Sequence, residues 1–587
     1  SPNFIREPAA HDAYDMAVSL MQGQQGTVGF DMENADHILS FGSGLLQGWG
    51  APVHMLNIHG SKQGQRKLVQ IEPRLSDTAA KADQWIPIKP GTEGALALGI
   101  AHIIIKESLY NKAFIKQQTF GFEDWTDAEG KTRTGFQTLV LKDYPPEIVS
   151  QMTGLAPAVI AGLAREFARA KKPLAVSSGG KGGLSGSLDE CMAVHALNAL
   201  VGNINQPGGV TVLAEQNYSK TPEVKFDQTA SRGLQKPRVD GAGTAKYPNT
   251  RYLLHRLPQV ISEAKGESPV QALFVSGGAN PLYTIADTAA TKAAFDRIPL
   301  VVSFSSCMDE TAQYADYILP SHSFLEQFAD VPPPPGAARP LVGLTQPVVR
   351  PVYDTRHVGD VVMQMGRSLG GFMESAFPWK DYKSYLKEAL KNHWDQLTEK
   401  GFADIPASAS KPQSGQFHTA SGKFEFSPGA QSRPATEDKA ALPGFTEIPI
   451  NGTTKDYPLV LIPYDSMRIA SGSTGNPPFM TKTIPADVLK EQTCFVEINP
   501  KTARNAGLSD GDRVTVATPI AKAEVRLRFF EGIEPGVVAM PSGLGQSTYS
   551  KYLAGKGVNS NDLIGPVEDP ASGLNAAWGI RARITRA

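Results

Sequence analysis

The chain has 587 residues, of which 41% are hydrophobic and 20% charged, and its formal net charge is −1. This length predicts several domains, and the lack of a basic excess excludes the electrostatic surface that nucleic-acid binding requires. No apolar run reaches the ~18–20 residues of a membrane-spanning helix, so we expect no transmembrane segment. The three cysteines form no Cys-x-x-Cys pair, so this chain by itself is not expected to bind an iron–sulfur cluster or a zinc ion.

The first 25 residues predict a loop followed by a helix over residues 9–21. His11 and Asp12 stand at the start of this helix. An imidazole or a carboxylate can bind a metal ion, but a histidine at a helix start also acts as a capping or hydrogen-bonding group. The residues alone leave both interpretations open.

A Rossmann-like lobe is predicted over residues 26–172. Its strand over residues 35–41 is followed by Gly-Ser-Gly, and glycines at the carboxyl end of a strand let the backbone approach a phosphate group. The next strand, over residues 68–71, leads into Glu72. This is the place where α/β folds put a carboxylate that binds ribose hydroxyl groups.

A largely buried helix is predicted over residues 95–105 because this stretch is almost entirely apolar. Thr92 precedes it as the expected N-cap, and Glu93 lies in the first turn. Two carboxylates, Glu72 at a strand end and Glu93 at a helix start, could bind the ribose and the donor edge of guanine. An ordinary β–α unit with a capped helix has the same spacing, so spacing does not separate the two interpretations.

Residues 173–440 are predicted to begin a second α/β unit. A strand over residues 173–178 leads into a glycine-rich turn that contains Lys181, and then into a helix over residues 188–201. Lys181 could contact a phosphate group, although the spacing is not that of a Walker A motif.

The middle of the chain alternates between loops and strands. Residues 210–249 predict an extended polar loop with little structure of its own. Strands are expected over residues 272–275 and 300–304, and each is followed by small polar residues. The Val-Pro-Pro-Pro-Pro-Gly sequence at 331–336 predicts a stiff, extended loop, for which a spacer is favoured over a partner-docking element.

Residues 441–587 form a region of a different kind. Short alternating apolar runs separated by turn residues predict several β-strands. A β-rich region would be uninformative by itself, but its position after two α/β units is informative.

Three consecutive segments carry a family resemblance. They are Ile-Glu-Pro-Arg at 71–74, Thr-Ala-Ala-Lys-Ala-Asp at 78–83 and Pro-Ile-Lys-Pro-Gly-Thr-Glu-Gly-Ala-Leu at 87–96. In this order they resemble the guanosine-binding segment of the molybdopterin oxidoreductases, the dimethyl sulfoxide reductase superfamily. Segments such as Ala-Asp-Tyr-Ile-Leu-Pro at 315–320 and Gly-Val-Asn-Ser-Asn at 557–561 extend the resemblance over nearly the whole chain.

The resemblance implies an α/β fold with two Rossmann-like α/β lobes and a C-terminal six-stranded β-barrel cap. It assigns residues 1–25 to the start of the second lobe, with the family's metal-ligand position. Residues 26–172 would be the first dinucleotide-binding lobe, 173–440 the second, and 441–587 the molybdopterin dinucleotide-binding barrel. We expect an N-terminal part, which in most members carries a four-cysteine [4Fe–4S] motif, to be missing.

The resemblance also implies the site residues. His11 would be the catalytic residue and the metal ligand, or else a proton shuttle, with Asp12 as the alternative ligand; the family usually has Cys, selenocysteine, Ser or Asp there. The implied cofactor-binding residues follow the strand ends, the helix starts and the barrel loops. They are Gly42, Ser43, Gly44, Glu72, Arg74, Asp83, Gly91, Thr92, Glu93, Gly179, Lys181, Gly277, Gly278, Asn280, Ser303, Ser305, Asp316, Gly543 and Asn559.

Two functions are compatible with this resemblance. The departure at His11 favours a subunit that kept the fold without the metal, similar to the molybdopterin-like subunits of menaquinone reductase complexes. Its partners would be an iron–sulfur electron-transfer subunit, a multihaem cytochrome and a membrane quinone-reactive subunit, at the periplasmic side of the membrane. The alternative is a catalytic subunit with bis(molybdopterin guanine dinucleotide) and Mo or W, similar to thiosulfate and polysulfide reductases.

Overall fold

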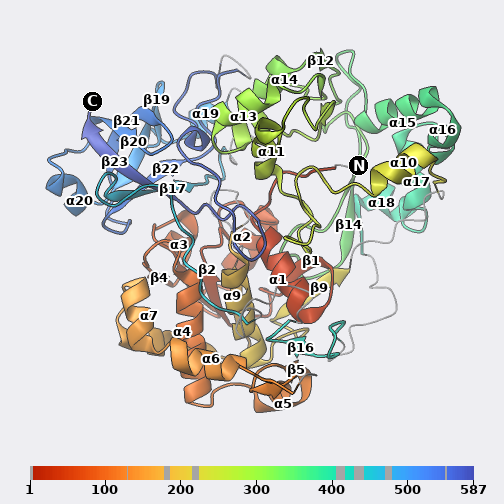
Figure 1. The fold of residues 1–587 in the computed structure, drawn as a ribbon. Helices are drawn as coiled ribbons and strands as arrows, with labels where there is room; N and C mark the ends of the chain where they lie inside the picture. Colours follow the sequence, from red (N-terminus) through yellow and green to blue (C-terminus); the bar gives the residue numbers. More distant parts are fainter. Residues whose placement is uncertain are drawn as a thin grey trace.

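The computed structural model describes residues 4–127, 130–177, 186–214, 224–404, 417–428, 442–469, 479–548 and 552–587. Figure 1 shows three parts: the first lobe at the bottom in red to orange, the second lobe at the top in green, and the barrel at the left in blue.

The first lobe is built on a four-stranded parallel sheet in the order β4-β3-β2-β8. Its strands are β2 (His37–Phe41), β3 (Lys67–Ile71), β4 (Gln84–Ile86) and β8 (Pro173–Ser177). Every residue of β2 and β8 is buried, as expected for a parallel sheet covered by helices on both faces.

Long apolar helices cover this sheet. In α4 (Glu93–Lys106) every residue except Lys106 is buried, and α9 (Leu188–Val201) packs along it. The lobe's other helices are α1 (Asp12–Gln22), α2 (Pro52–Ser61), α3 (Asp77–Lys81), α5 (Lys112–Gln118), α6 (Phe136–Asp143), α7 (Pro146–Thr153) and α8 (Pro157–Arg169). Its short outer strands are β1 (Gly26–Phe30), β5 (Thr119–Phe120), β6 (Trp125–Thr126), β7 (Thr132–Arg133), β9 (Val210–Ala214) and β16 (Phe424–Glu425).

The strand pairing corrects two expectations for this part of the chain. β8 was expected to open the second α/β unit, but it pairs with β2, because the strand that follows α8 returns to the edge of the first sheet. Residues 210–249 were expected to lack structure, yet β9 pairs antiparallel with β1, and α10 (Gln228–Leu234) follows with Asp227 as its N-cap. Residues 1–25 were also assigned to the start of the second lobe, but α1 packs against α9 and β1 and contributes to the core of the first lobe. The other domain boundaries stay predictions.

The second lobe has a smaller parallel sheet in the order β10-β11-β12. The strands are β10 (Leu273–Val275), β11 (Val301–Ser303) and β12 (Tyr317–Ile318). The helices around it are α11 (Leu257–Glu263), α12 (Pro281–Thr284), α13 (Thr288–Phe295) and α14 (Glu310–Tyr314). Seven buried apolar residues form its core, far fewer than in the first lobe.

A small antiparallel sheet and four helices follow the second lobe. The strands are β13 (Ala329–Val331), β14 (Leu341–Thr345) and β15 (Phe402–Asp404), and the helices are α15 (Val358–Leu369), α16 (Gly371–Ala376), α17 (Tyr382–Ala389) and α18 (Trp394–Lys400). The proline-rich loop ends at Gly336, whose backbone N donates to the carbonyl of Val28 in β1 (2.9 Å). This contact connects the loop to the first lobe, which agrees with an internal spacer.

The C-terminal region closes into a six-stranded barrel, as the resemblance implied. The sheet runs β19-β21-β20-β23-β17-β22, and the additional pairing of β22 with β19 closes the ring. These strands are β17 (Leu459–Tyr464), β19 (Thr493–Ile498), β20 (Arg513–Ala517), β21 (Lys522–Phe529), β22 (Val537–Pro541) and β23 (Ile580–Arg586), with β18 (Leu489–Lys490) attached to β19. The short helices α19 (Met480–Thr483) and α20 (Pro500–Asn505) connect them.

Among the described residues, no single helix has both the length and the apolar composition needed to cross a membrane. Helices α7 and α8 reach that length and composition only as a pair, and the chain bends by 110° between them.

Candidate functional site

The two lobes contain the same local motif after a central strand. In the first lobe Ser76 caps α3, and the carboxylate of Asp83 accepts a hydrogen bond from the backbone N of Leu68 (2.7 Å). In the second lobe Asp309 caps α14, and Asp316 accepts in the same way from the backbone of β11 (2.7 Å). Each aspartate therefore fixes the end of a short strand, and a cofactor contact by Asp83 or Asp316 stays a prediction.

The glycine turn after β2 has the properties of a phosphate cradle. Gly42 has φ of +65°, a conformation that glycine adopts without strain. Ser43 is fully buried, and its hydroxyl has no hydrogen-bond partner in the described part of the chain. A Cβ at Gly44 would lie 3.0 Å from the flexible side chain of Gln47. A buried hydroxyl without a partner costs about 1–3 kcal/mol, so an acceptor placed beside Ser43 would stabilise this turn.

The two predicted residues after β3 have different roles. The carboxylate of Glu72 accepts hydrogen bonds from Gln70 Nε2 (3.1 Å) and from the backbone N of Ser76 (3.2 Å). Arg74 points toward the barrel and makes a two-pronged ion pair with Glu497, with Nε–Oε2 at 2.5 Å and Nη2–Oε1 at 3.0 Å.

The Arg74 guanidinium also lies 3.8 Å from the centre of the Tyr464 ring. The Glu497 side chain is only 2% exposed, and Arg528 Nη1 also binds its Oε1 at 3.0 Å. Arg74 therefore ties the first lobe to the barrel, a role that the sequence analysis missed.

The start of α4 is covered by the C-terminal end of the barrel. A Cβ at Gly91 would lie 2.6 Å from the ring of Trp578, so only glycine fits there. Thr92 stands at the N-cap position, but its hydroxyl donates to the carbonyl of Lys89 (2.7 Å) and caps no N–H group of the helix, contrary to expectation. Glu93 is fully buried.

A cavity of about 20 Å³ remains between α4, α9 and Trp578, with Glu93 and Glu190 in its wall. The indole N–H of Trp578 is buried and has no partner in the described residues. The sequence analysis did not find Trp578, because nothing local indicates that residue 578 meets residue 91.

The second lobe offers open space at its glycine turn. Gly277 and Gly278 have φ of +71° and +79°, and an added Cβ at either would meet nothing within 4 Å. Asn280 is mostly buried, and its side-chain oxygen accepts hydrogen bonds from the backbone N (3.1 Å) and the hydroxyl (2.7 Å) of Thr311, while its amide N donates to Glu310 (2.8 Å). The glycine pair can approach a ligand, whereas the Asn280 side chain joins α12 to α14.

The predicted serines lie at the carboxyl end of β11. Ser303 is buried, and its hydroxyl accepts from the backbone N of Ser305 (3.2 Å). The hydroxyl of Ser305 donates to Asp309 (2.7 Å). Both hydroxyls take part in the turn that precedes α14, so a phosphate contact by either stays a prediction.

Barrel loops join the second lobe through hydrogen bonds. The amide N of Asn559 donates to the carbonyl of Tyr283 (3.0 Å), and the hydroxyl of Tyr283 donates to the carbonyl of Leu544 (2.8 Å). The neighbouring Gly543 has φ of +89°. Asn559 thus lies where the barrel meets the second lobe, and its predicted cofactor contact stays a prediction. Gly179 and Lys181 lie outside the described residues.

The start of α1 lies beside a cavity of about 300 Å³. Its wall contains Asp12 and Asp15 from α1, the segment 248–252 and Leu574. Both carboxylate oxygens of Asp12 are bound, one by Arg6 Nη2 (2.5 Å) and the other by the backbone N of Ala9 (2.9 Å). The Asp12 carboxylate therefore holds the loop that precedes the helix in place.

His11 is half-buried at the N-cap position of α1, and its side chain caps no N–H group. Its Nε2 lies 3.8 Å from Asp15 Oδ2. Burial lowers the pKa of His11, although Asp12 opposes the shift, and burial together with Asp12 raises the pKa of Asp15 to about 7. Among the described residues there is no group of three or more His, Cys, Asp or Glu side chains that could hold a metal ion. Of the two predicted ligands, Asp12 is held by an ion pair and a hydrogen bond, whereas His11 makes a longer contact of 3.8 Å with Asp15.

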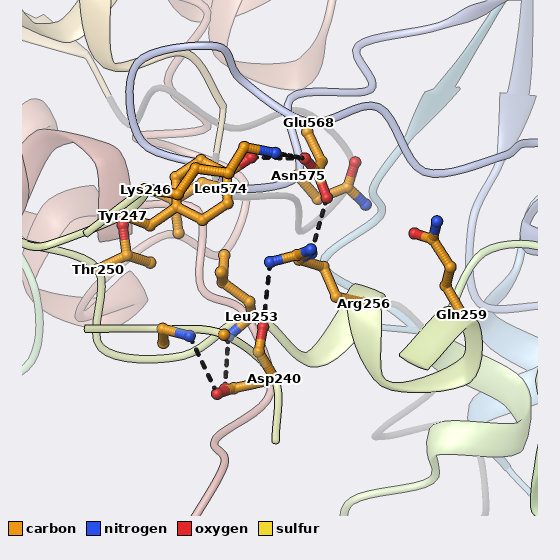
Figure 2. A network of polar contacts seen from close by, with 12 residues as sticks. Asp240, Lys246, Tyr247, Thr250, Leu253, Arg256, Gln259, Glu568, Leu574 and Asn575 are labelled. Carbon is orange, nitrogen blue, oxygen red and sulfur yellow. Dashed lines mark hydrogen bonds and ion pairs between the residues drawn. The ribbon is translucent and has the colours of Figure 1, made fainter. Parts of the chain in front are cut away.

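A polar network fixes residues 238–256 against the barrel loop 568–575 (Figure 2). Asp240 is fully buried, and its carboxylate accepts a hydrogen bond from the backbone N of Leu253 (3.0 Å). Arg256 Nε makes an ion pair with Glu568 Oε1 at 2.9 Å.

The same loop is held at its tip. The hydroxyl of Tyr247 donates to Glu568 Oε2 (2.6 Å), and a Cβ at Gly573 would lie 2.7 Å from the Tyr247 ring. Thr250 donates to the carbonyl of Ser572 (2.5 Å). The network therefore positions Thr250 and Leu574, which both line the cavity beside α1. The sequence analysis missed this wall because it expected an unstructured loop here.

Two family models match the chain. A model described as molybdopterin oxidoreductase matches residues 8–357, and one described as molydopterin dinucleotide binding domain matches residues 475–579. The first covers more than half of the chain, and the second falls on the barrel.

Curated relatives align over the full chain. The menaquinone reductase molybdopterin-binding-like subunit of Nitratidesulfovibrio vulgaris is 29% identical, with 100% of this chain and 76% of the relative covered. The arsenate respiratory reductase molybdopterin-containing subunit of a Shewanella species is 24% identical (100% and 79% covered), and the thiosulfate reductase molybdopterin-containing subunit of Salmonella typhimurium is 25% identical (98% and 77% covered).

A solved structure shares the fold. Acetylene hydratase from Pelobacter acetylenicus superposes with a TM-score of 0.79 at 21% identity, and the match covers 98% of this chain and 82% of that one. At this identity the likeness concerns the fold alone.

Proposed function

Because this chain belongs to the molybdopterin oxidoreductase family, we propose that it is the molybdopterin-family subunit of a membrane-associated respiratory electron-transfer complex of the menaquinone reductase type. Its partners in this proposal are an iron–sulfur electron-transfer subunit, a multihaem cytochrome and a membrane quinone-reactive subunit. The complex would lie at the periplasmic side of the membrane and be held there through the partners. In it, this chain would position electron carriers rather than transform a substrate.

The observation that carries this proposal is the arrangement at the start of α1. The family's usual ligand types are Cys, selenocysteine, Ser and Asp, and here the position is held by His11 and Asp12. Turning the Asp12 carboxylate away from the loop toward a metal would break its ion pair with Arg6 and its hydrogen bond from Ala9. Losing a hydrogen bond to a charged group costs about 1.5–3 kcal/mol, so the fold favours the arrangement without a ligand from Asp12.

The alternative is a catalytic subunit that binds bis(molybdopterin guanine dinucleotide) with Mo or W. The unpartnered hydroxyl of Ser43 and the open space at Gly277 and Gly278 favour it, because these features fit phosphate and backbone contacts to a dinucleotide. When bound, such a group supplies two-electron oxygen-atom or hydride chemistry. His11 would then hold the metal or a proton, and the network around Asp240 would keep the cavity wall in place.

Metal and pterin analysis separates the two functions. The protein is purified from its own host, Mo and W are measured by plasma mass spectrometry, and the extracted pterin is measured by fluorescence. We expect far less than one Mo or W per chain, together with co-purification of partner subunits in constant stoichiometry. About one Mo or W per chain with pterin would overturn the proposal in favour of the catalytic alternative.

Two variants extend this test. If metal is present, His11→Ala should release it, while His54→Ala, at an exposed position of α2, should retain it. Pterin without metal would mean that the nucleotide sites are kept for structure, and Ser43→Ala should then lower the pterin content.

A further inference from the structure

Exposed apolar side chains concentrate in one stretch of the chain. Of the 26 large hydrophobic residues exposed in the described parts, 14 lie between residues 308 and 369, which is about a tenth of the sequence. Single exposed apolar residues are common on protein surfaces, but a contiguous group marks an interaction site.

Nine of these residues form one surface, which we call the β12 patch. They lie on β12 and on the two segments that follow it, residues 319–325 and 348–353. The patch consists of Tyr317, Ile318, Leu319, Phe324, Leu325, Val348, Val349, Val352 and Tyr353.

Backbone hydrogen bonds hold the two segments together. The backbone N atoms of Val348 and Val349 both donate to the carbonyl of Leu325, at 2.9 and 3.2 Å. At the other end Arg356 donates to the carbonyl of Pro320 (3.1 Å) and forms a bridge with Ser321. The two segments therefore lie side by side and follow directly from β12, which is labelled at the top of Figure 1.

The patch has the size of a protein interface. Its side chains are 37–81% exposed, and Tyr353 and Phe324 reach 81% and 69%. With a full side-chain area of roughly 200 Å² each, they offer on the order of 900 Å² of apolar surface. This is close to the ~800 Å² that one partner contributes to a standard interface.

Two charged side chains in and around the patch already make hydrogen bonds within the chain. Glu326 accepts hydrogen bonds from the backbone N atoms of Ser323 (2.9 Å) and Val352 (3.0 Å), and Arg356 donates to Gln364 (3.4 Å). Arg350 is exposed within the patch and has no ion-pair partner in the described part of the chain. A lipid surface would call for several lysines and arginines around the apolar residues, and the patch does not have them. Tyrosine, phenylalanine and arginine are instead the residues enriched at protein–protein interfaces.

We propose that the β12 patch is the docking surface for a partner protein subunit whose own surface is apolar and carries a carboxylate opposite Arg350. This rests on the proposed function, because it requires the chain to work as a subunit; three relatives are themselves named as subunits of reductases. The partner would cover Phe324 and Tyr353 and pair with Arg350, in a region away from the cavity beside α1.

Hydrogen–deuterium exchange of the intact assembly tests whether the partner binds at the β12 patch. The tagged full chain is purified with its partners from its own host, and its exchange is compared with that of the same chain separated from them. We expect slower exchange in the assembly at residues 317–325 and 348–353. Slower exchange elsewhere without any change in these segments would overturn the patch but leave the proposed function standing.

Charge substitutions test whether the partner contacts the patch through apolar side chains and a carboxylate. Tyr353→Asp and Arg350→Glu should each reduce the recovered partner at least tenfold, while Val53→Asp, at an 83% exposed position on α2, should not change it. Unchanged unfolding midpoints for the isolated variants exclude misfolding as the cause. Equal recovery with all three variants would contradict the proposal.

Other occupants give different results. If a second copy of this chain covers the patch, light scattering will show a dimer that Tyr353→Asp dissociates. If the patch binds lipid, anionic phosphatidylglycerol vesicles will slow exchange at residues 348–353 in the isolated chain. Either outcome overturns the proposal, and a chain that purifies from its host as a lone monomer contradicts the proposed function itself.

Discussion

The two α/β lobes share a motif but differ in how they are covered. Both place an aspartate, Asp83 or Asp316, 2.7 Å from the backbone N of a central strand. In the first lobe β2 and the edge strand β8 are buried throughout, whereas in the second lobe the edge strands expose side chains, with Phe274 of β10 47% exposed and Tyr317 of β12 64% exposed. The motif therefore sets the local turn, and the helices packed around it decide whether the sheet becomes a core or a surface.

The same contrast appears where each lobe meets the barrel. The first lobe is joined through the buried Arg74–Glu497 ion pair, and the second through hydrogen bonds of Asn559 and Tyr283. We infer that the first lobe and the barrel form the rigid part of the molecule and that the second lobe carries the surface available to partners. Four predictions test this contrast, in order of decreasing effect.

The largest effect is expected at the junction of the first lobe. Glu497→Ala leaves the largely buried Arg74 without its carboxylate partner, which should destabilise the protein by about 3–5 kcal/mol, while the partly exposed Arg528 keeps its ion pair with Asp487. Asn559→Ala at the other junction should cost about 1 kcal/mol. Urea unfolding measures both, with exposed Glu524→Ala as the control. Equal losses at the two junctions would remove the contrast between the lobes.

A buried histidine predicts acid sensitivity of the first lobe. Burial lowers the pKa of His195 to about 3, and its ring nitrogens contact Tyr14 (3.1 Å) and Gln22 (2.9 Å). The folded state prefers the neutral ring, so this stability is present above the unfolded pKa of about 6.5 and is lost as the pH falls toward 3.

Between about pH 7.5 and about pH 5 the native chain should lose about 2 kcal/mol more than His195→Gln. Thermal unfolding at the two pH values measures this difference, with exposed His54→Gln as the control. If His195→Gln is as acid-sensitive as the native chain, the pH dependence comes from elsewhere.

The shared motif predicts similar losses in both lobes. Asp83→Ala and Asp316→Ala each remove one charge-assisted hydrogen bond from an exposed carboxylate, which should cost about 1–2 kcal/mol. Hydrogen exchange at β3 and β11 measures the local loss. A much larger loss in one lobe would mean that the aspartates do not play equivalent parts.

The smallest effect is expected on the β12 patch. Phe324→Ser and Tyr353→Ser should change the stability of the isolated chain by no more than about 0.5 kcal/mol, because both side chains are mostly exposed. Differential scanning fluorimetry of the isolated variants measures this, with Phe295→Ser, at a buried position of α13, as the destabilising comparison. A large loss in Phe324→Ser would mean that the patch supports the fold instead of a partner.

Local signals predicted much of the fold. The helix expected over residues 188–201 is α9 with the same bounds, and the strand before Glu72 is β3. The barrel expected from the resemblance closes through six strands. The helix and the strand follow from apolar periodicity and turn residues, which lie within a few residues of each other, whereas the barrel was expected from the family resemblance.

Other features could not be predicted, because they depend on contacts between distant residues. Arg74 was expected at a cofactor, yet its partner Glu497 lies 423 positions away. Residues 210–249 were expected to be an extended loop, whereas residues 248–252 form part of a cavity wall that is held by the contacts of Tyr247 and Arg256 with Glu568.

The local motifs, the order of lobes and barrel, and the departure of His11 from the family's usual ligands can all be recognised in the sequence. The ion pair of Asp12 with Arg6, the contact of Trp578 with Gly91 and the exposure of β12 become visible only in the folded chain. The physical reason is that hydrogen bonds within a turn depend on neighbouring residues, whereas burial and ion pairing depend on which distant surfaces the folded chain brings together.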